Sequence, residues 1–169
     1  QVHGTTPDKI HFHEVGAVDS IVDIVGAFVL MELLDWPRVL CSPLNVGSGT
    51  VSCAHGVLPV PAPATALLLR GLPIFSQGAP MERTTPTGAL LARTLASAFC
   101  SIPAGSVIAS SFGLGNRDSE DMPNVLRALL MDSGRMEAGQ VDEGLVHERL
   151  TLLECNIDDM NPQDFEPVS

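Results

Sequence analysis

The sequence has few aromatic and few basic residues. Its 169 residues include six phenylalanines, one tryptophan and no tyrosine, yet 45% of the chain is hydrophobic. The core must therefore be built mainly from aliphatic side chains. The 9 Lys and Arg residues are outnumbered by 20 Asp and Glu residues, which gives a formal charge of −11 and no basic cluster. This balance argues against a protein that coats nucleic acid.

The chain also lacks a cysteine framework and a long hydrophobic run. Its four cysteines are scattered without a CxxC pair, at Cys41, Cys53, Cys100 and Cys155. This pattern favours the reduced thiols of a cytoplasmic protein over a secreted disulfide scaffold. The longest apolar run, around residues 24–34, is broken by Gly26 and Glu32 and is too short to span a bilayer. We therefore expect no membrane partner.

Common nucleotide-binding and hydrolase motifs are absent. The sequence contains no Walker A motif, no GxGxxG after a strand pattern and no G-x-S-x-G elbow. Because Lys9 is the only lysine, a lysine-based phosphate clamp is nearly excluded. Arg83, Arg117 and Arg127 remain as possible partners for an anion.

Residue periodicity predicts an α/β domain, or a mixed α+β one, with a small sheet and flanking helices. Helices are predicted at residues 18–34, at 64–70 after Pro63, and from Pro86 through Ala98. The first helix is so rich in apolar residues that we expect most of it to be buried. Strands are predicted at residues 9–15, 38–46, 72–75, 106–112, 124–131 and 150–157.

The chain begins at Gln1 without a methionine and ends inside an acidic segment, so we expect it to be part of a longer protein. We expect an α/β domain over residues 1–133. Residues 134–148 mix glycine, acids and glutamine and are interpreted as a linker. Residues 149–169 are expected to begin a C-terminal domain that is truncated. The strand edges left unpaired by truncation predict a homo-oligomer.

The densest group of metal-ligand side chains lies near the N-terminus. His11 and His13 share one face of a predicted strand next to Glu14, and Asp19 and Asp23 share one helix face. Imidazole and carboxylate ligands suit a divalent cation such as nickel, zinc or manganese. The alternative is that the carboxylates bond to nearby loops and the histidines lie at a sheet edge.

A second polar loop runs from Gly47 to Gly56. Cys53 and His55 could add soft ligands for a later transition metal. The glycines could equally serve only to shape a turn, and this interpretation is favoured.

A helix start offers a possible phosphate site. Thr84, Thr85, Thr87 and Gly88 present hydroxyls and backbone amides at the start of the predicted helix, and Arg117 could add a positive charge. A helix cap alone explains the same threonines.

Several segments together resemble the LarC family of nickel-insertion proteins, formerly a domain of unknown function. They run in the family's order and are HFHEVGAVDSIVDIVG (11–26), GSGTVSCAHGVLPVPAPAT (47–65), TTPTGALL (84–91), GLGNRD (113–118), PNVLRALL (123–130) and LECNIDDMNPQ (153–163).

The resemblance implies insertion of nickel into pyridinium-3,5-bisthiocarboxylic acid mononucleotide, a step in making the nickel-pincer cofactor. In the family the reaction depends on CTP, with Mn²⁺ or Mg²⁺, and nickel is the substrate. The resemblance also implies that residues 1–133 are an N-terminal-half domain that lacks its first elements, the family's opening strand and glycine-rich turn. Because the nucleotide-handling half of the family is its C-terminal domain, CTP and its metal are not expected to bind this chain alone. The chain would instead hold metal or the pyridinium mononucleotide for that domain. No catalytic residue is assigned.

Two other functions remain open. The chain could be a structural or oligomerisation module without a ligand site, or part of a metal-dependent phosphohydrolase. The second is weakly supported, because no base and nucleophile pair stands out.

Overall fold

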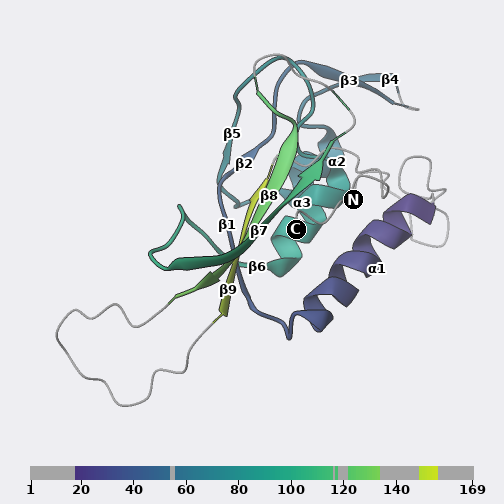
Figure 1. Cartoon of the computed structure of the whole chain (residues 1–169). Coiled ribbons are helices and arrows are strands. Elements are labelled where there is room, and N and C mark those ends of the chain that lie inside the picture. The colour runs from purple at the N-terminus through teal and green to yellow at the C-terminus, as the bar shows by residue number, and fades with distance from the viewer. Residues whose placement is uncertain (1–17, 54–55, 116, 118–121, 134–148, 156–169) are drawn as a thin grey trace.

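The computed structural model describes residues 18–53, 56–115, 117, 122–133 and 149–155, which form helices and small sheets (Figure 1). The predicted mixed α/β fold class is confirmed. The predicted strand at residues 9–15 and the linker at 134–148 lie outside the described residues. Within the described part, no helix is both long enough and apolar enough to cross a membrane.

The described residues form the following helices and strands. The helices are α1 (Val18–Leu33), α2 (Pro63–Leu68) and α3 (Pro86–Leu95). The strands are β1 (Arg38–Cys41), β2 (Leu44–Asn45), β3 (Thr50–Cys53), β4 (Gly56–Pro59), β5 (Ile74–Phe75), β6 (Ala96–Phe99), β7 (Ser106–Leu114), β8 (Val125–Asp132) and β9 (Arg149–Cys155).

The largest sheet has five strands in the order β6-β1-β9-β8-β7. Strand β1 pairs in parallel with both β6 and β9. Strand β8 is antiparallel to β9 and to β7, so β7 runs in the same direction as β1. Strands β1, β6, β7 and β9 therefore all end at one edge of the sheet, which we call the carboxyl edge.

Strand β9 lies at the centre of this sheet. Its residues pair with β1 on one side and with β8 on the other, from Arg38↔Leu150 to Leu126↔Cys155. The sequence predicts this strand but assigns it to a following domain. The observed pairing joins residues 149–155 to the sheet formed by the preceding residues. The position of the domain boundary in the whole protein stays a prediction.

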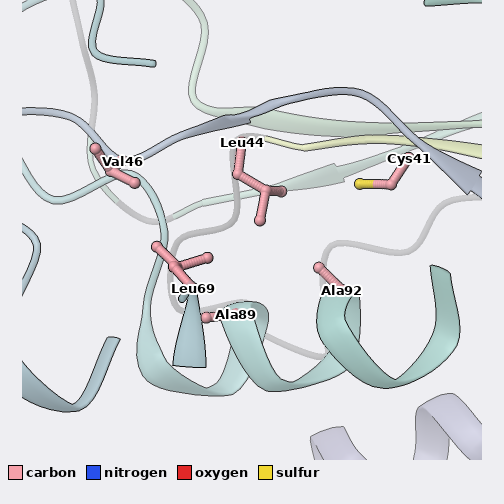
Figure 2. Packing of buried hydrophobic residues seen from close by; sticks show 6 residues of the cluster. All are labelled: Cys41, Leu44, Val46, Leu69, Ala89 and Ala92. Carbon is pink, nitrogen blue, oxygen red and sulfur yellow. The ribbon is translucent and has the colours of Figure 1, made fainter. Parts of the chain in front are cut away.

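The main core lies between α3 and the strands β1 and β2 (Figure 2). Small residues on α3 let the helix approach the strands closely, and α2 contributes at one end. The buried members are Cys41, Leu44, Val46, Leu69, Ala89 and Ala92. Leu126 of β8 packs against the same cluster. A smaller cluster contains Leu40, Leu129 and Met131.

The predicted helix starts are confirmed, but α2 and α3 both end earlier than predicted, α2 at Leu68 instead of residue 70. Helices α2 and α3 both begin with a proline, a residue whose fixed φ and missing N–H suit a first turn. Helix α3 ends at Leu95, whereas the sequence predicts helix through Ala98. Ala96 is extended, with φ −70° and ψ 122°, and begins β6, which pairs with β1. Parallel pairing with a neighbouring strand overrides the local helix preference of this alanine-rich segment.

The predicted strand at residues 38–46 is two strands. Ser42 and Pro43 separate β1 from β2, and β2 pairs with β5 in a separate two-stranded sheet. A proline cannot donate to a ladder, so a continuous central strand is interrupted there. The antiparallel pair of β3 and β4, which ends at Pro59, was not among the predicted strands.

Helix α1 has the predicted bounds to within a residue, but the expectation of extensive burial is wrong. Met31 is its one buried residue, and α1 packs against α3. The chain leaves the helix through Asp35 and Trp36, both of which have positive φ. Trp36 folds back so that its ring lies 6.1 Å from that of Phe28. Much of the apolar surface of α1 therefore remains exposed in the described structure.

Candidate functional site

The described residues of both predicted sites lie at the carboxyl edge. Helix α1 runs opposite to β1, which follows it after a short connection (Figure 1). Helix α3 leads directly into β6 and runs opposite to β1 and β2, because Ala89 to Ala92 follow the direction that leads back from Leu44 to Cys41 (Figure 2). Both helices therefore begin at this edge, with Asp19 and Asp23 on α1 and Thr85 at the start of α3. Arg117 follows β7 and lies at the same edge. In open α/β sheets, ligands bind outside the carboxyl ends of the strands.

Asn45 connects three segments at this edge. Its side chain is fully buried, and its Oδ1 accepts hydrogen bonds from the amides of Gly47 (3.1 Å) and Gln77 (3.2 Å). Its Nδ2 donates to the carbonyl of Gln77 at 3.1 Å. Its own carbonyl accepts a 2.7 Å hydrogen bond from Thr84 Oγ1. One residue thus fixes the segment 76–85 against the end of β2.

Two glycines allow this segment to pack closely. Gly47 has φ +76°, and a Cβ there would collide with the carbonyl oxygen of Met81. Gly78 has φ +91°, and a Cβ there would lie 2.6 Å from Nη2 of Arg83. Arg83 is fully buried, so its guanidinium is held inside the fold beside Gly78. Larger residues at either glycine would displace the backbone or this cation.

Three of the four predicted phosphate-site residues on this segment, Thr84, Thr85 and Gly88, take part in structural hydrogen bonds. Thr84 is fully buried and donates to Asn45, as above. Thr85 is the N-cap of α3, and its Oγ1 accepts from the amide of Gly88 at 3.3 Å. The cap interpretation is therefore confirmed for Thr85. Because Pro86 has no N–H, the amide and hydroxyl of the half-buried Thr87 are the groups left at this helix start for an anion.

Arg117 is held by its backbone and exposes its side chain. Nδ2 of the buried Asn124 donates to the carbonyl of Arg117 at 3.3 Å. Nearby, the amide of Gly115 donates to the carbonyl of Asn124 at 2.9 Å. The turn between β7 and β8 thus places an exposed guanidinium at the carboxyl edge.

The predicted metal site is only partly within the described residues. Asp19 is exposed in the first turn of α1, and Asp23 is half-buried one turn later. His11, His13, Glu14 and His55 lie outside the described residues. Across the part of the chain that the structure describes, no three His, Cys, Asp or Glu side chains form a group that could hold a metal ion. Cys53 is half-buried at the end of β3, where it pairs with Gly56.

The sequence alone does not indicate a role for Asn45, and it marks Arg83 only as a possible anion partner. Asn45 contacts Gln77 and Thr84, which lie 32 and 39 residues further along the chain. No local spacing predicts such contacts. The available signal is an asparagine at the end of an apolar strand pattern, followed by Gly47.

Comparison with known proteins identifies relatives along the whole chain. A family described as "Nickel insertion protein" matches residues 1–169. A protein of Akkermansia muciniphila named "Pyridinium-3,5-bisthiocarboxylic acid mononucleotide nickel insertion protein" is 46% identical over 163 residues, covering 96% of this chain and 38% of its own length. A Nocardioides protein of the same name is 48% identical over 167 residues, covering 99% of this chain and 40% of its own.

A third relative, from Geobacter metallireducens, is named "Putative nickel insertion protein" and is 48% identical over 163 residues. It too is matched over 96% of this chain and 40% of its own length. The chain thus spans about two fifths of the length of these curated relatives. No solved structure matches the chain.

Proposed function

Because the chain belongs to the nickel insertion protein family, we propose that it takes part in inserting nickel into pyridinium-3,5-bisthiocarboxylic acid mononucleotide. Nickel is the substrate that is transferred, and the pyridinium mononucleotide is the acceptor. The observation that supports the proposal is that α1 and α3 start, and β7 ends, on the same side of the sheet, which is the side of Asp19, Asp23, Thr87 and Arg117. Carboxylates there can bind a metal, and the hydroxyl, amide and guanidinium groups can bind an anion. Together they suit a ligand that carries both a metal-binding site and a phosphate.

The phosphate of the mononucleotide binds at the start of α3 in this proposal. Thr87 supplies a hydroxyl and an amide, and Arg117 supplies charge across the edge. Thr84 and Thr85 shape the site through their hydrogen bonds to Asn45 and Gly88. A local cation is needed because the chain has a formal charge of −11, which repels a phosphate at longer range.

The metal would be held beside the mononucleotide by side chains near the N-terminus. Asp19 and Asp23 would supply carboxylates, and His11, His13, Glu14 and His55 complete the proposed ligand set. Imidazole ligands suit nickel, and carboxylates can complete its coordination.

The remaining steps belong to the whole family protein. We assign the CTP-dependent reaction, of lyase type and assisted by Mn²⁺ or Mg²⁺, to the part of the relatives' length that this chain does not span. That part is the expected partner of the carboxyl edge. The scattered cysteines fit a cytoplasmic protein, and the exposed surface of α1 fits an oligomer.

A second candidate is a structural module without a ligand site. It is favoured by one observation: the hydroxyls of Thr84 and Thr85 already serve the fold. Under this alternative, Thr87 and Arg117 have no ligand, and changing them alters nothing but the surface.

A binding titration distinguishes the two candidates. Nicotinic acid mononucleotide, a pyridinium mononucleotide with one phosphate, is titrated calorimetrically into the chain. We expect binding that weakens roughly threefold to tenfold in Thr87→Val and about tenfold in Arg117→Gln. The matched control is Thr94→Val on the same helix, whose hydroxyl bonds to the Leu90 carbonyl at 2.8 Å, far from the site. Binding that is absent, or unchanged in both variants, would leave the structural module as the function.

A further inference from the structure

One side of α1 is an exposed apolar stripe. Its members have the helical spacing of a packing face, yet each is between 47% and 77% exposed. They are Val18, Ile21, Val22, Val25, Val29, Leu30 and Leu33. The buried Met31 lies on the opposite side of the helix from Val22 and Val29. No element of the described structure covers the stripe, whereas an apolar helix face normally packs against another element.

Gly26 lies in the middle of α1, at the border of this stripe. A Cβ at Gly26 would meet nothing within 4 Å, so the fold itself does not require glycine there. Glycine in a helix interior is destabilising compared with alanine. Close approach of another backbone is one physical reason for a glycine at such a position. The helix therefore carries a second, independent feature that suits a close neighbour on this side.

The stripe is also symmetric along the helix. The midpoint of α1 falls between Val25 and Gly26. Apolar residues lie at equal distances on either side of it, in the pairs Val18 and Leu33, Ile21 and Leu30, and Val22 and Val29. A second α1 helix running antiparallel across this midpoint would therefore place apolar residues against apolar residues along its whole length.

We infer that the exposed stripe of α1 is the interface with a second copy of this chain. The two α1 helices pack antiparallel about a two-fold axis that passes near Gly26. Gly26 of one copy therefore lies beside Gly26 of the other. Such an isologous contact is the commonest arrangement in homodimers. The seven side chains present roughly 700 Å² per copy, close to the ~800 Å² per partner of a standard interface.

The charges of α1 are compatible with this arrangement. At 100° per residue around the helix, Asp19 projects between Leu33 and Leu30 and Glu32 projects between Ile21 and Val25, so the two acids lie toward opposite edges of the stripe. A two-fold axis across an antiparallel pair places each edge of the stripe against the same edge of the partner's stripe. The two acidic residues therefore do not meet across the interface, and like-charge repulsion is small.

Sedimentation equilibrium of the 169-residue chain tests the interface. We expect a dimer in the micromolar range that weakens at least tenfold in Val25→Glu, because a carboxylate would be buried in the stripe. The matched control is Val107→Glu on the edge strand β7, where the valine is 56% exposed against 55% for Val25. This control should dimerise as the unchanged chain does, and circular dichroism should show that both variants stay folded.

The Gly26→Leu variant distinguishes close helix packing from non-specific hydrophobic association. The variant has a better helix former and a larger apolar surface, so non-specific association would strengthen. Close packing at the axis would instead be blocked, and dimerisation should weaken at least tenfold. A chain that stays monomeric at high micromolar concentration would overturn the inference and assign the stripe to a different partner. Stronger dimerisation of Gly26→Leu, or equal loss in Val107→Glu, would also overturn it.

Discussion

Asn45 and Gln77 exchange two hydrogen bonds although 32 residues separate them: Asn45 Nδ2 donates to the Gln77 carbonyl, and Asn45 Oδ1 accepts from the Gln77 amide. The Asn45 side chain thereby satisfies the backbone amide and carbonyl of Gln77, as a neighbouring strand would. Its position at the end of β2 fixes the segment that leads into Thr84, Thr85 and α3. The geometry of the proposed phosphate site thus depends on a buried amide that contacts no ligand.

Replacing this amide should destabilise the fold. Asn45→Ala leaves the amides of Gly47 and Gln77 without their acceptor, so we expect the free energy of unfolding to fall by about 2–4 kcal/mol. Urea denaturation followed by circular dichroism measures this change. Gln77→Ala is the matched control, because Asn45 contacts only the backbone of Gln77 and that side chain is exposed. If both variants were as stable as the unchanged chain, the hydrogen bonds of Asn45 would contribute little to the free energy of unfolding.

Two glycines with similar positive φ should tolerate alanine differently. Gly47 and Gly71 have φ of +76° and +81°, but only at Gly47 would a Cβ collide with another residue, at the Met81 carbonyl. We expect Gly71→Ala to cost about 1 kcal/mol and Gly47→Ala at least about 3 kcal/mol. Thermal melts of the two variants compare them directly. Similar melting temperatures would mean that backbone conformation alone, and not the close approach to Met81, decides the cost.

The acidic residues of α1 should contribute to nickel binding. We expect the chain to bind Ni²⁺, and Asp19→Asn with Asp23→Asn to weaken that binding about tenfold or more, since carboxylates are lost from the ligand set. Calorimetric titration with Ni²⁺ measures the effect, and the His11→Ala/His13→Ala variant should lose binding as well. Glu32→Gln, at the far end of the same helix, is the control and should bind like the unchanged chain. Nickel affinity unaffected by the double aspartate change would remove Asp19 and Asp23 from the site.

Local chemistry made part of this structure predictable. The prolines at 63 and 86 and the N-cap Thr85 mark helix starts that the structure confirms. The segment 96–99 is a strand because β1 lies beside it, which the local sequence does not reveal. The burial of α1 was overestimated for a related reason, since periodicity shows that a face is apolar but not what covers it.

In the candidate site, too, local features could be predicted from the sequence, whereas contacts between distant segments could not. Thr85 was recognisable as a cap from its place before Pro86. The role of Asn45 was not, because it arises from contacts between segments that are distant in the sequence. The common location of α1, α3 and Arg117 likewise depends on strand order, which puts β9 between β1 and β8.

The most direct test of the central claim maps where the mononucleotide binds. Amide resonances of the isotope-labelled chain are followed by NMR during titration with nicotinic acid mononucleotide. Binding at the carboxyl edge predicts the largest shifts at Thr87, Gly88 and Arg117, with little change at Thr94 or Arg38 at the opposite end of the sheet. Shifts centred on Thr94 and Arg38, or no saturable shift at all, would contradict the assignment of this edge as the mononucleotide site.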